Sequence, residues 1–426
     1  MRVLLVHNYY GSSAPSGENQ VFEAERAMLE RYGKTVDVFT RHSDEIRIGL
    51  GRRSRSTVVG RFFLWMRRLR GLVKGAVCTV ANPFAARALG RKIREFRPDV
   101  VHFHNTFPLI SPLAVRAARK SGAKVVMTLH NYRMVCAAGI PMRCGRVCRD
   151  CFSYAVNPSI RQSVNLSILP ALRNRCYRGS MWATLPLALN IWLYRKCWAK
   201  WVDNFVVLSE FQKKVMIECG LPAEKIVVKG NFIQSNKLNN PNDRTMRSGV
   251  VFVGRLSDEK GVKTLLKAWR MLNQSIGQSV NPSIPQSVNP SLPLTLIGDG
   301  VQRVEYESLA TGLNVRFLGK LSHARVLEEL AKAKLLVAPS ECWETFGLVL
   351  VEAAMCGTPA VVSDLGALPG IVAKLGVGKV FKSGDADGLA VKIRDVMDGQ
   401  LSLQEFKVDE FGEERNFKKL NEIYSA

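Results

Sequence analysis

The stretch LLVAPSECWETFGLVLVEAAMCGTPAVVS, residues 335–363, holds two short apolar runs separated by one segment of helical length. The runs at 335–338 and 360–363 are unbroken, as expected for strands that helices cover on both faces. The apolar residues 348–356 between them predict a helix. A strand, a helix and a second strand in this order predict a βαβ unit with parallel strands.

The same alternation continues outward through the whole chain. Further strands are expected at residues 3–7, 36–40, 100–104, 124–129, 205–208, 226–229, 250–253, 294–297 and 315–318. Further helices are expected at residues 20–32, 113–121, 211–219, 261–272 and 325–333. This pattern predicts an α/β protein with two doubly wound, Rossmann-like domains, for which 426 residues are sufficient.

The domain boundary is expected in the polar, Asn-rich stretch around Pro241. It separates an N-terminal domain at 1–235 from a C-terminal domain at 248–408, and a last helix at 409–426 is expected to pack back toward the N-terminal domain. Segments 157–168 and 273–293 look foreign to the fold, and the second holds the tandem octapeptide QSVNPSIP-QSVNPSLP. We interpret both as surface insertions, with a docking motif as the alternative.

The charge balance is strongly basic, because 61 Lys and Arg face 36 Asp and Glu, leaving +25. Such a charge attracts phosphates, nucleic acid or anionic lipid without choosing among them. No helix-turn-helix, RNP-like or zinc-finger pattern supports a nucleic-acid-binding protein, so no nucleic acid partner is expected. The short apolar start and the absence of an 18-residue apolar run predict a cytoplasmic protein.

Two strand ends carry residues suited to a phosphate ligand. Arg255 and Lys260 follow the strand at 250–253, where they can reach one diphosphate from two sides. The alternative is that they belong to a solvated surface. Gly298 and Gly300 follow the next strand, where glycine lets backbone approach a ligand at the carboxyl edge of a parallel sheet.

The helix expected at 348–356 adds an anion site and two acids. The free amides of Phe346, Gly347 and Leu348 at its start point toward an anion. Glu352 lies roughly 8 Å inside this apolar helix, where a charge needs a partner or a ligand such as ribose hydroxyls. Glu344 precedes the helix, where a donor sugar would sit. The alternative for both acids is a solvated position.

Together these features resemble glycosyltransferase family 4, also called glycosyl transferases group 1, whose members are retaining nucleotide-sugar transferases of GT-B fold. The family's Gly-Arg…Lys-Gly loop, Gly-Asp-Gly strand end and Glu-x7-Glu pattern around Phe-Gly occur here in order. In the first half, the histidine-bearing strand ends at 97–105 and 126–132 and the loop with Gly17 also match. The resemblance covers nearly the whole chain apart from the two insertions.

The resemblance implies two domains facing across a cleft and a retaining, metal-independent hexosyltransferase. The enzyme would move a sugar from a nucleotide diphosphate sugar to a saccharide or lipid-linked saccharide in bacterial cell-surface polysaccharide synthesis, without a catalytic cofactor. Arg255 and Lys260 would hold the diphosphate, Glu352 the ribose and Glu344 the sugar ring. His130 would approach the sugar from the facing domain. The remaining donor contacts would come from Gly17, Gly254, Gly298, Gly300, Phe346, Gly347 and Leu348. Alternatives are an inactive or epimerase-like GT-B relative.

A cysteine cluster follows the second histidine-bearing strand, and Cys148 and Cys151 in it form a C-x2-C pair. Such a pair with two further thiols fits a structural zinc site. A subset of the resembled family carries a similar pattern. We expect Cys136, Cys148, Cys151 and Cys176 to be the zinc ligands, with Cys144 spare; unliganded thiols are the alternative.

Residues 51–100 are rich in Lys and Arg and hold only two acids, Glu95 and Asp99. Within this segment, residues 61–74 interleave aromatic side chains with Arg, as interfacial helices do. We hypothesise peripheral attachment to the anionic inner face of the membrane. The alternative is an ordinary domain helix with a basic, solvated face.

Overall fold

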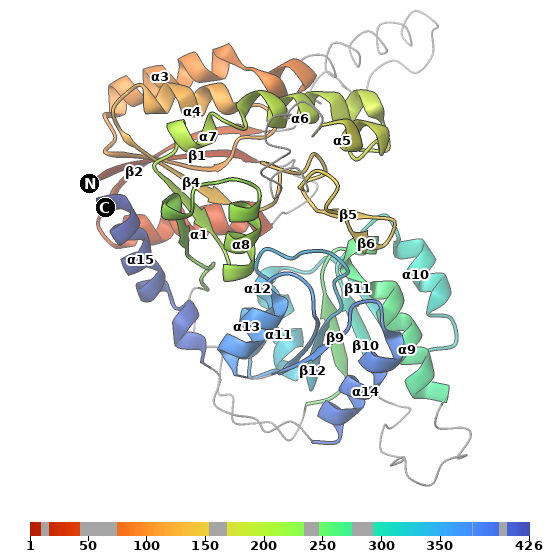
Figure 1. Cartoon of the computed structure of the whole chain (residues 1–426). Coiled ribbons are helices and arrows are strands. Elements are labelled where there is room, and N and C mark those ends of the chain that lie inside the picture. The colour runs from red at the N-terminus through yellow and green to blue at the C-terminus, as the bar shows by residue number, and fades with distance from the viewer. Residues whose placement is uncertain are drawn as a thin grey trace, which may run out of the picture. The chain divides into compact units, whose positions relative to one another are not determined.

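The computed structural model describes residues 1–9, 17–42, 75–152, 168–233, 247–274, 293–376, 378–399 and 407–426. Its contacts divide the chain into two compact units (Figure 1). Unit 1 comprises Met1–Pro141, Arg149–Gly230 and Asn416–Ala426, and unit 2 comprises Met142–Cys148 and Asn231–Arg415. The stretch around Pro241, the octapeptide repeat up to residue 292, residues 157–167 and the basic segment 61–74 lie outside the described residues.

Unit 1 is built on a six-stranded sheet. Its strands are β1 (Arg2–Tyr9), β2 (Thr35–His42), β3 (Val100–Asn105), β4 (Lys124–Leu129), β7 (Asn204–Val207) and β8 (Ile226–Val228). They lie in the order β2-β1-β3-β4-β7-β8 with all neighbours parallel. The carboxyl ends of β3 and β4 therefore lie at one edge and present the residues that follow them, among which is His130.

The helices of unit 1 cover this sheet. They are α1 (Gly17–Arg31), α3 (Pro83–Phe96), α4 (Pro112–Arg119), α5 (Leu169–Arg173), α6 (Met181–Tyr194), α7 (Trp198–Trp201), α8 (Glu210–Glu218) and the 3-10 turn η4 (Ala223–Lys225). Side-chain caps mark some of their starts: Asn82 accepts from the amide of Ala85 at 3.0 Å, and Ser209 accepts from that of Gln212 at 3.2 Å.

The last helix, α15 (Glu413–Ser425), joins unit 1 through polar contacts in the interior. The Nζ of Lys229, at the end of β8, donates to Oδ1 of Asn416 at 2.9 Å. The hydroxyl of Tyr424 lies 2.7 Å from Nδ1 of His102 on β3. All four side chains are buried, so these contacts fasten the end of the chain onto the first sheet.

Unit 2 is built on a second six-stranded parallel sheet. Its strands are β9 (Val250–Val253), β10 (Leu294–Ile297), β11 (Val315–Gly319), β12 (Leu335–Ala338), β13 (Ala360–Ser363) and β14 (Gly378–Phe381). Their order is β11-β10-β9-β12-β13-β14, the doubly wound order of dinucleotide-binding folds. The order reverses between β9 and β12, and ligands of such sheets bind beyond the carboxyl ends of these strands.

The connections of unit 2 are mostly helical. They are η6 (Asp258–Lys260), α9 (Val262–Gln274), α10 (Arg303–Leu309), α11 (His323–Lys332), α12 (Leu348–Met355), α13 (Leu368–Leu375), α14 (Ala386–Met397) and η7 (Val408–Phe411). A short hairpin of β5 (Met142–Arg143) and β6 (Arg146–Val147) is grouped with this unit.

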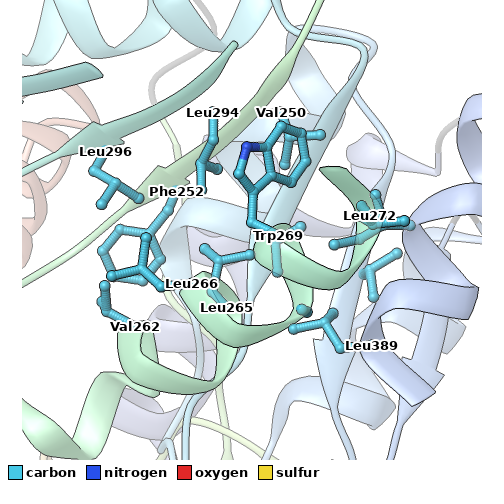
Figure 2. Packing of buried hydrophobic residues seen from close by; sticks show 14 of the residues in the cluster. Val250, Phe252, Val262, Leu265, Leu266, Trp269, Leu272, Leu294, Leu296 and Leu389 are labelled. Carbon is cyan, nitrogen blue, oxygen red and sulfur yellow. The ribbon is translucent and has the colours of Figure 1, made fainter. Parts of the chain in front are cut away.

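The core of unit 2 fixes the start of α9 relative to the sheet. Val262, Leu266 and Trp269 recur at helical spacing on α9 and are at most 3% exposed. Figure 2 shows Trp269 packed near Val250 of β9 and Leu294 of β10. Burial of this face holds the η6 turn, and with it Lys260, beside the carboxyl end of β9.

The predicted fold class, an α/β protein with two doubly wound domains, is confirmed by the two sheets. The strand β14 was not among the predicted strands, and the helices named from the sequence did not include α6 or, among others, α3, α13 and α14. Among the described residues, no helix combines the length and the apolar character that crossing a membrane requires.

Candidate functional site

The candidate site in unit 2 begins at the point where the strand order reverses. Gly254 and Arg255 follow β9, and residues 339–344 follow β12, so both segments meet at the edge where doubly wound sheets bind ligands. The Arg255 side chain is 64% exposed and pairs with Glu259 at 2.9 Å. Because an exposed ion pair contributes little free energy, the Arg255 guanidinium can exchange Glu259 for a phosphate group.

Lys260 and Glu344 form the centre of this site. The Nζ of Lys260 lies 2.5 Å from Oε1 of Glu344, and the hydroxyl of Ser340 donates to the same oxygen at 2.8 Å. Both charged side chains are about four-fifths buried. The structure thus brings together two predicted site residues that are 84 positions apart, one from each strand end.

Lys260 and Glu344 each stabilise the charged form of the other. Burial alone would raise the pKa of Glu344, but the Lys260 ammonium and the hydrogen bonds from Lys260 and Ser340 outweigh it, so the pKa lies below its usual range. Burial likewise opposes the charged form of Lys260, and Glu344 raises the pKa above its usual value. Both groups are therefore charged at neutral pH.

The N-terminus of α12 supplies backbone donors beside this pair. Gly347 caps the helix with φ of 93°, in the left-handed region, and its carbonyl oxygen accepts from the amide of Leu350 at 3.0 Å. Helix geometry leaves the amides before Leu350 without an acceptor in the helix. Phe346 is 2% exposed and packs edge-on against Phe411, with ring centroids 5.8 Å apart. The predicted amides at Phe346, Gly347 and Leu348 therefore belong to a rigid turn that suits an anion.

Glu352, predicted to bind ribose, has a partner in the structure. It is 7% exposed on α12, and its Oε1 lies 2.9 Å from Nε2 of His323, the first residue of α11. The hydrogen bond that His323 donates to the Glu352 carboxylate raises the pKa of His323, whose side chain is half exposed. The buried Glu352 carboxylate, for which the sequence showed no partner, thus has a hydrogen bond from His323. Because His323 is half exposed, a ligand hydroxyl can take its place.

The glycines at the strand ends bring backbone against backbone. At Gly298, where φ is 135°, an added Cβ would lie 1.8 Å from the carbonyl oxygen of Gly254. At Gly261, where φ is 67°, it would lie 1.9 Å from that of Pro339. Gly300 is similar, because an added Cβ there would lie 2.1 Å from the carbonyl oxygen of Leu256. These glycines let neighbouring backbone approach and so define the loops that hold Arg255 and Lys260, while the ligand contacts predicted for Gly298 and Gly300 stay a prediction.

The candidate residues of unit 1 lie beyond β3 and β4. His130 follows β4, is 8% exposed, and its Nε2 lies 3.0 Å from Nδ1 of His104. Burial is the main reason that the pKa of His130 lies well below its usual value, and the nearby His104 lowers it further. The imidazole is therefore neutral at physiological pH and can exchange hydrogen bonds without carrying charge.

A cavity of about 80 Å³ opens beside His130, entirely within unit 1. Its walls include Phe107 and Trp198, with Asn190 and Arg133 as polar groups. The Arg133 guanidinium stacks over the Phe107 ring at 4.3 Å. An aromatic wall with a few polar groups is the usual composition of a site for a small organic ligand.

A buried polar cluster that the sequence did not predict lies behind this cavity. Oε1 of Glu25 is 3.1 Å from both Nδ1 of His102 and Nε2 of His104, and its Oε2 is 3.0 Å from Nζ of Lys229. Among the described residues, these two histidines and Glu25 form the one group with metal-ligand spacing. Because the Lys229 ammonium already neutralises the carboxylate, we assign the cluster a structural role.

The predicted Gly17 begins α1, and an added Cβ there would meet nothing within 4 Å. Its neighbour Glu18 accepts a hydrogen bond from the Asn131 side chain at 2.7 Å. The start of α1 is thereby tied to the residue directly after His130.

The cysteines predicted to bind zinc are not gathered into a metal site. Cys136, Cys151 and Cys176 belong to unit 1 and Cys148 to unit 2. Cys151 and Cys176 both pack against the small apolar cluster around Leu187. No group of three potential ligands within metal-binding distance, searched over the described residues, includes a cysteine, so the geometry gives the zinc prediction no support.

The chain contains one Asp-x-Asp sequence, a pattern that binds divalent metals in many nucleotide-sugar enzymes, at Asp385-Ala-Asp387. Asp385 is the N-cap of α14 and accepts from the amide of Gly388 at 2.9 Å. Helix capping accounts for Asp385 and for the acid in the first turn after it.

Several residues of the candidate site could not be found from the sequence. His323 and Ser340 lie outside the recognised patterns, and only the fold brings them to Glu352 and Glu344. The strand-end sequence His102-Phe103-His104 was a signal for the buried cluster, but its partners come from distant elements.

Two family models match the chain with this geometry in place. The model described as Glycosyltransferase Family 4 matches residues 17–237, more than half of the chain, and the model described as Glycosyl transferases group 1 matches residues 234–410. The chain belongs to glycosyltransferase family 4. The strand ends with Arg255, Lys260 and Glu344 fall in the second match, and His130 falls in the first.

Relatives of this family 4 chain include a glycogen synthase of Mycobacterium tuberculosis (strain ATCC 25618 / H37Rv), which is 34% identical over 318 residues, 73% of this chain and 63% of the relative. A sulfoquinovosyl transferase of Arabidopsis thaliana is 24% identical over 72% of this chain and 51% of its own length. The matches thus span less than two thirds of either relative.

A solved structure, HepE of Anabaena in complex with UDP-glucose, shares the fold. It matches with a TM-score of 0.58 and 17% identity, and the alignment covers 100% of both chains. This likeness confirms the GT-B fold that the sequence resemblance implied.

Proposed function

We propose that this chain is a retaining hexosyltransferase that takes its sugar from a nucleotide diphosphate sugar and gives it to a saccharide acceptor. The observation that carries the proposal is the Lys260–Glu344 pair, which lies at the reversal point of the second sheet, on the segment that leads into the N-terminus of α12. A cation, an acid and an anion-binding helix start at one edge suit a diphosphate joined to a sugar.

In this proposal the donor site stabilises the leaving diphosphate. Arg255, Lys260 and the first amides of α12 neutralise the charge that grows on the phosphate oxygens as the bond to the sugar breaks. Glu344 contacts the sugar ring and keeps Lys260 oriented. The bond between the sugar and the diphosphate oxygen breaks, the acceptor hydroxyl forms the new bond on the same face, and its proton passes to the departing diphosphate oxygen. The anomeric configuration is thereby retained without a protein nucleophile or a catalytic metal.

Glu352 is assigned to the ribose hydroxyls. A carboxylate accepts from paired hydroxyls as it accepts from His323, and the half-exposed His323 can turn away when the nucleotide arrives. In this proposal Glu352 contributes to binding of the nucleotide, whereas Glu344 contributes to transfer of the sugar.

The acceptor side is assigned to the cavity beside His130. Stacked Phe107 and Arg133 suit the apolar face and the hydroxyls of a sugar ring. The family pattern assigns His130 to the donor sugar, and a lipid-linked saccharide of cell-surface polysaccharide synthesis is the acceptor class that we propose. The uridine nucleotide bound to HepE makes UDP-sugars the first donors to test.

The proposal is tested with a panel of nucleotide sugars, scored by thermal shift and by release of nucleoside diphosphate. We expect at least one donor to raise the melting temperature and to be hydrolysed slowly without acceptor. Glu344→Gln should keep the thermal shift and lose the release, whereas Glu352→Gln should lose the shift. The proposal is wrong if no nucleotide sugar stabilises the protein and none is turned over.

A further inference from the structure

The helix α6, Met181–Tyr194, is apolar on all sides yet exposed on one of them. Trp182 is 75% exposed, Met181 and Leu193 are each 46% exposed, and Trp192 is 40% exposed. A soluble surface helix ordinarily carries polar residues on its outer side. The sequence MWATLPLALNIWLY has no charged residue at all.

The exposed residues of α6 form a continuous face. At about 100° per residue, the exposed Met181 and Trp192 fall on one stripe with the partly buried Leu185. The exposed Trp182 and Leu193 fall on the adjacent stripe with the partly buried Leu189. The opposite side, with Thr184, Leu187, Ala188 and Tyr194, is buried. Helix α5 packs beside α6 (Figure 1) and adds Leu169, 51% exposed, to the apolar residues of the outer surface.

Basic residues flank this face at both ends. Arg173, Arg175 and Arg178 precede α6 and are exposed, and Arg195, Lys196 and Lys200 follow it. From Cys151 to Val202 the sequence has no Asp or Glu. An apolar, Trp-containing face with cations at its rim is complementary to an anionic bilayer, in which Trp lies at the headgroup level and Arg and Lys reach the phosphates.

We propose that the exposed face of α6, with the Arg residues between α5 and α6, is a membrane-binding surface for anionic phospholipid. The helix lies in the plane of the interface, because its 14 residues are too few to span a bilayer. The charge of this surface selects anionic over neutral lipid, and the aromatic face supplies the apolar contact. The residues of this surface do not include the basic segment 61–74, for which the sequence suggested membrane attachment and which lies outside the described residues.

Helix α6 also connects this surface to the cavity beside His130. Leu187 and Asn190 line the cavity, and Asn190 donates to the carbonyl oxygen of Thr79 at 2.5 Å. One helix thus carries the lipid-facing residues on one side and cavity-lining residues on another. A lipid-linked acceptor held in the bilayer would reach the cavity along α6, which extends the acceptor side of the proposed function, whereas lipid binding itself requires no transferase activity.

The test is co-sedimentation of the full chain with vesicles of phosphatidylcholine alone and of phosphatidylcholine mixed with phosphatidylglycerol. We expect binding only to the mixed vesicles, with a blue shift of Trp fluorescence. Trp182→Ser with Trp192→Ser should weaken this binding about tenfold or more, because both side chains lose their apolar contact. Arg173→Gln, Arg175→Gln and Arg178→Gln together should weaken it and reduce its dependence on salt.

The matched control is Val301→Ser with Val304→Ser in unit 2, two side chains that are 90% and 78% exposed, which should bind vesicles as the wild type does. Unchanged melting temperatures would show that the variants fold. The proposal is overturned if the wild type binds both vesicle types equally, or if the Trp variant binds as the wild type does. It is also overturned if the two Trp changes abolish a concentration-dependent dimer in gel filtration without weakening vesicle binding, since a second copy would then cover this face.

Discussion

The buried pair of Lys260 and Glu344 predicts a strong coupling between two substitutions. Lys260→Met leaves the Glu344 carboxylate four-fifths buried without its cation, so the free energy of unfolding should fall by about 2–3 kcal/mol. Adding Glu344→Gln should restore part of this loss, because a neutral amide needs no counter-charge. Urea denaturation of the two single variants and the double variant measures the coupling, and strictly additive losses would contradict the ion pair.

His323 predicts a pH dependence of nucleotide binding. Its pKa is raised by Glu352, so the pair stabilises the fold fully below about pH 6.5 and loses this contribution as pH rises through the raised pKa. With a half-exposed histidine the contribution is no more than about 1 kcal/mol. A protonated His323 competes with the ribose for Glu352, so affinity for a nucleoside diphosphate should increase from pH 6 to pH 8.

The control variant is His323→Gln, because a glutamine side chain cannot become protonated and so cannot form an ion pair with Glu352. Titration calorimetry at both pH values should give the variant a smaller change in affinity than the wild type, the remainder arising from the phosphate itself. Equal changes in the two proteins would show that His323 does not compete for Glu352.

At the scale of the elements, the loops at the end of the second sheet predict which glycines are essential. Gly298→Ala and Gly261→Ala force a Cβ against a carbonyl oxygen at a left-handed φ, so each should cost about 2–3 kcal/mol and abolish donor binding. Gly370→Ala on α13 is the matched control, because its Cβ would meet nothing within 4 Å. It should instead stabilise the helix by about 0.5–1 kcal/mol, and thermal unfolding ranks the three variants.

The same elements show what the sequence could predict. Continuous apolar runs such as Val250–Val253 identified buried strands correctly, because a strand covered on both faces leaves a clear pattern. β14 was missed, since Gly378–Phe381 contains Lys379 and lies at the edge of its sheet. α6 was missed because its sequence is apolar on every side and so shows no helical period, and because Pro186 is disfavoured inside a helix.

For the site, the sequence identified Lys260, Glu344 and Glu352 but not their contacts. Lys260 and Glu344 are 84 positions apart, and they meet only because the fold brings the ends of β9 and β12 to one edge of the sheet. A spacing within one segment of sequence contains no such information. The cysteine spacing suggested a zinc site in the same way, without information on which thiols meet in space. In the described residues, no three of these thiols lie within metal-binding distance of one another.

For the molecule as a whole, the interior of unit 1 predicts destabilisation by acid. Burial lowers the pKa of His102 to about 4 and that of His7 to about 3, and it lowers the pKa of His130 well below its usual value. These rings are neutral in the folded chain and titrate near pH 6.5 in the unfolded chain. Below pH 6.5 the unfolded state therefore binds more protons, and stability falls with pH.

Each of these histidines contributes a loss of up to about 1.4 kcal/mol per pH unit until the pH reaches its folded pKa. Urea denaturation should accordingly give a clearly smaller free energy of unfolding at pH 5 than at pH 7. His7→Leu keeps a side chain that can pack on Phe22, which His7 stacks on at 4.5 Å, and removes one titrating group, so its loss between these pH values should be smaller. Equal stability of the wild type at both pH values would mean that the rings are hydrated and titrate normally in the folded chain.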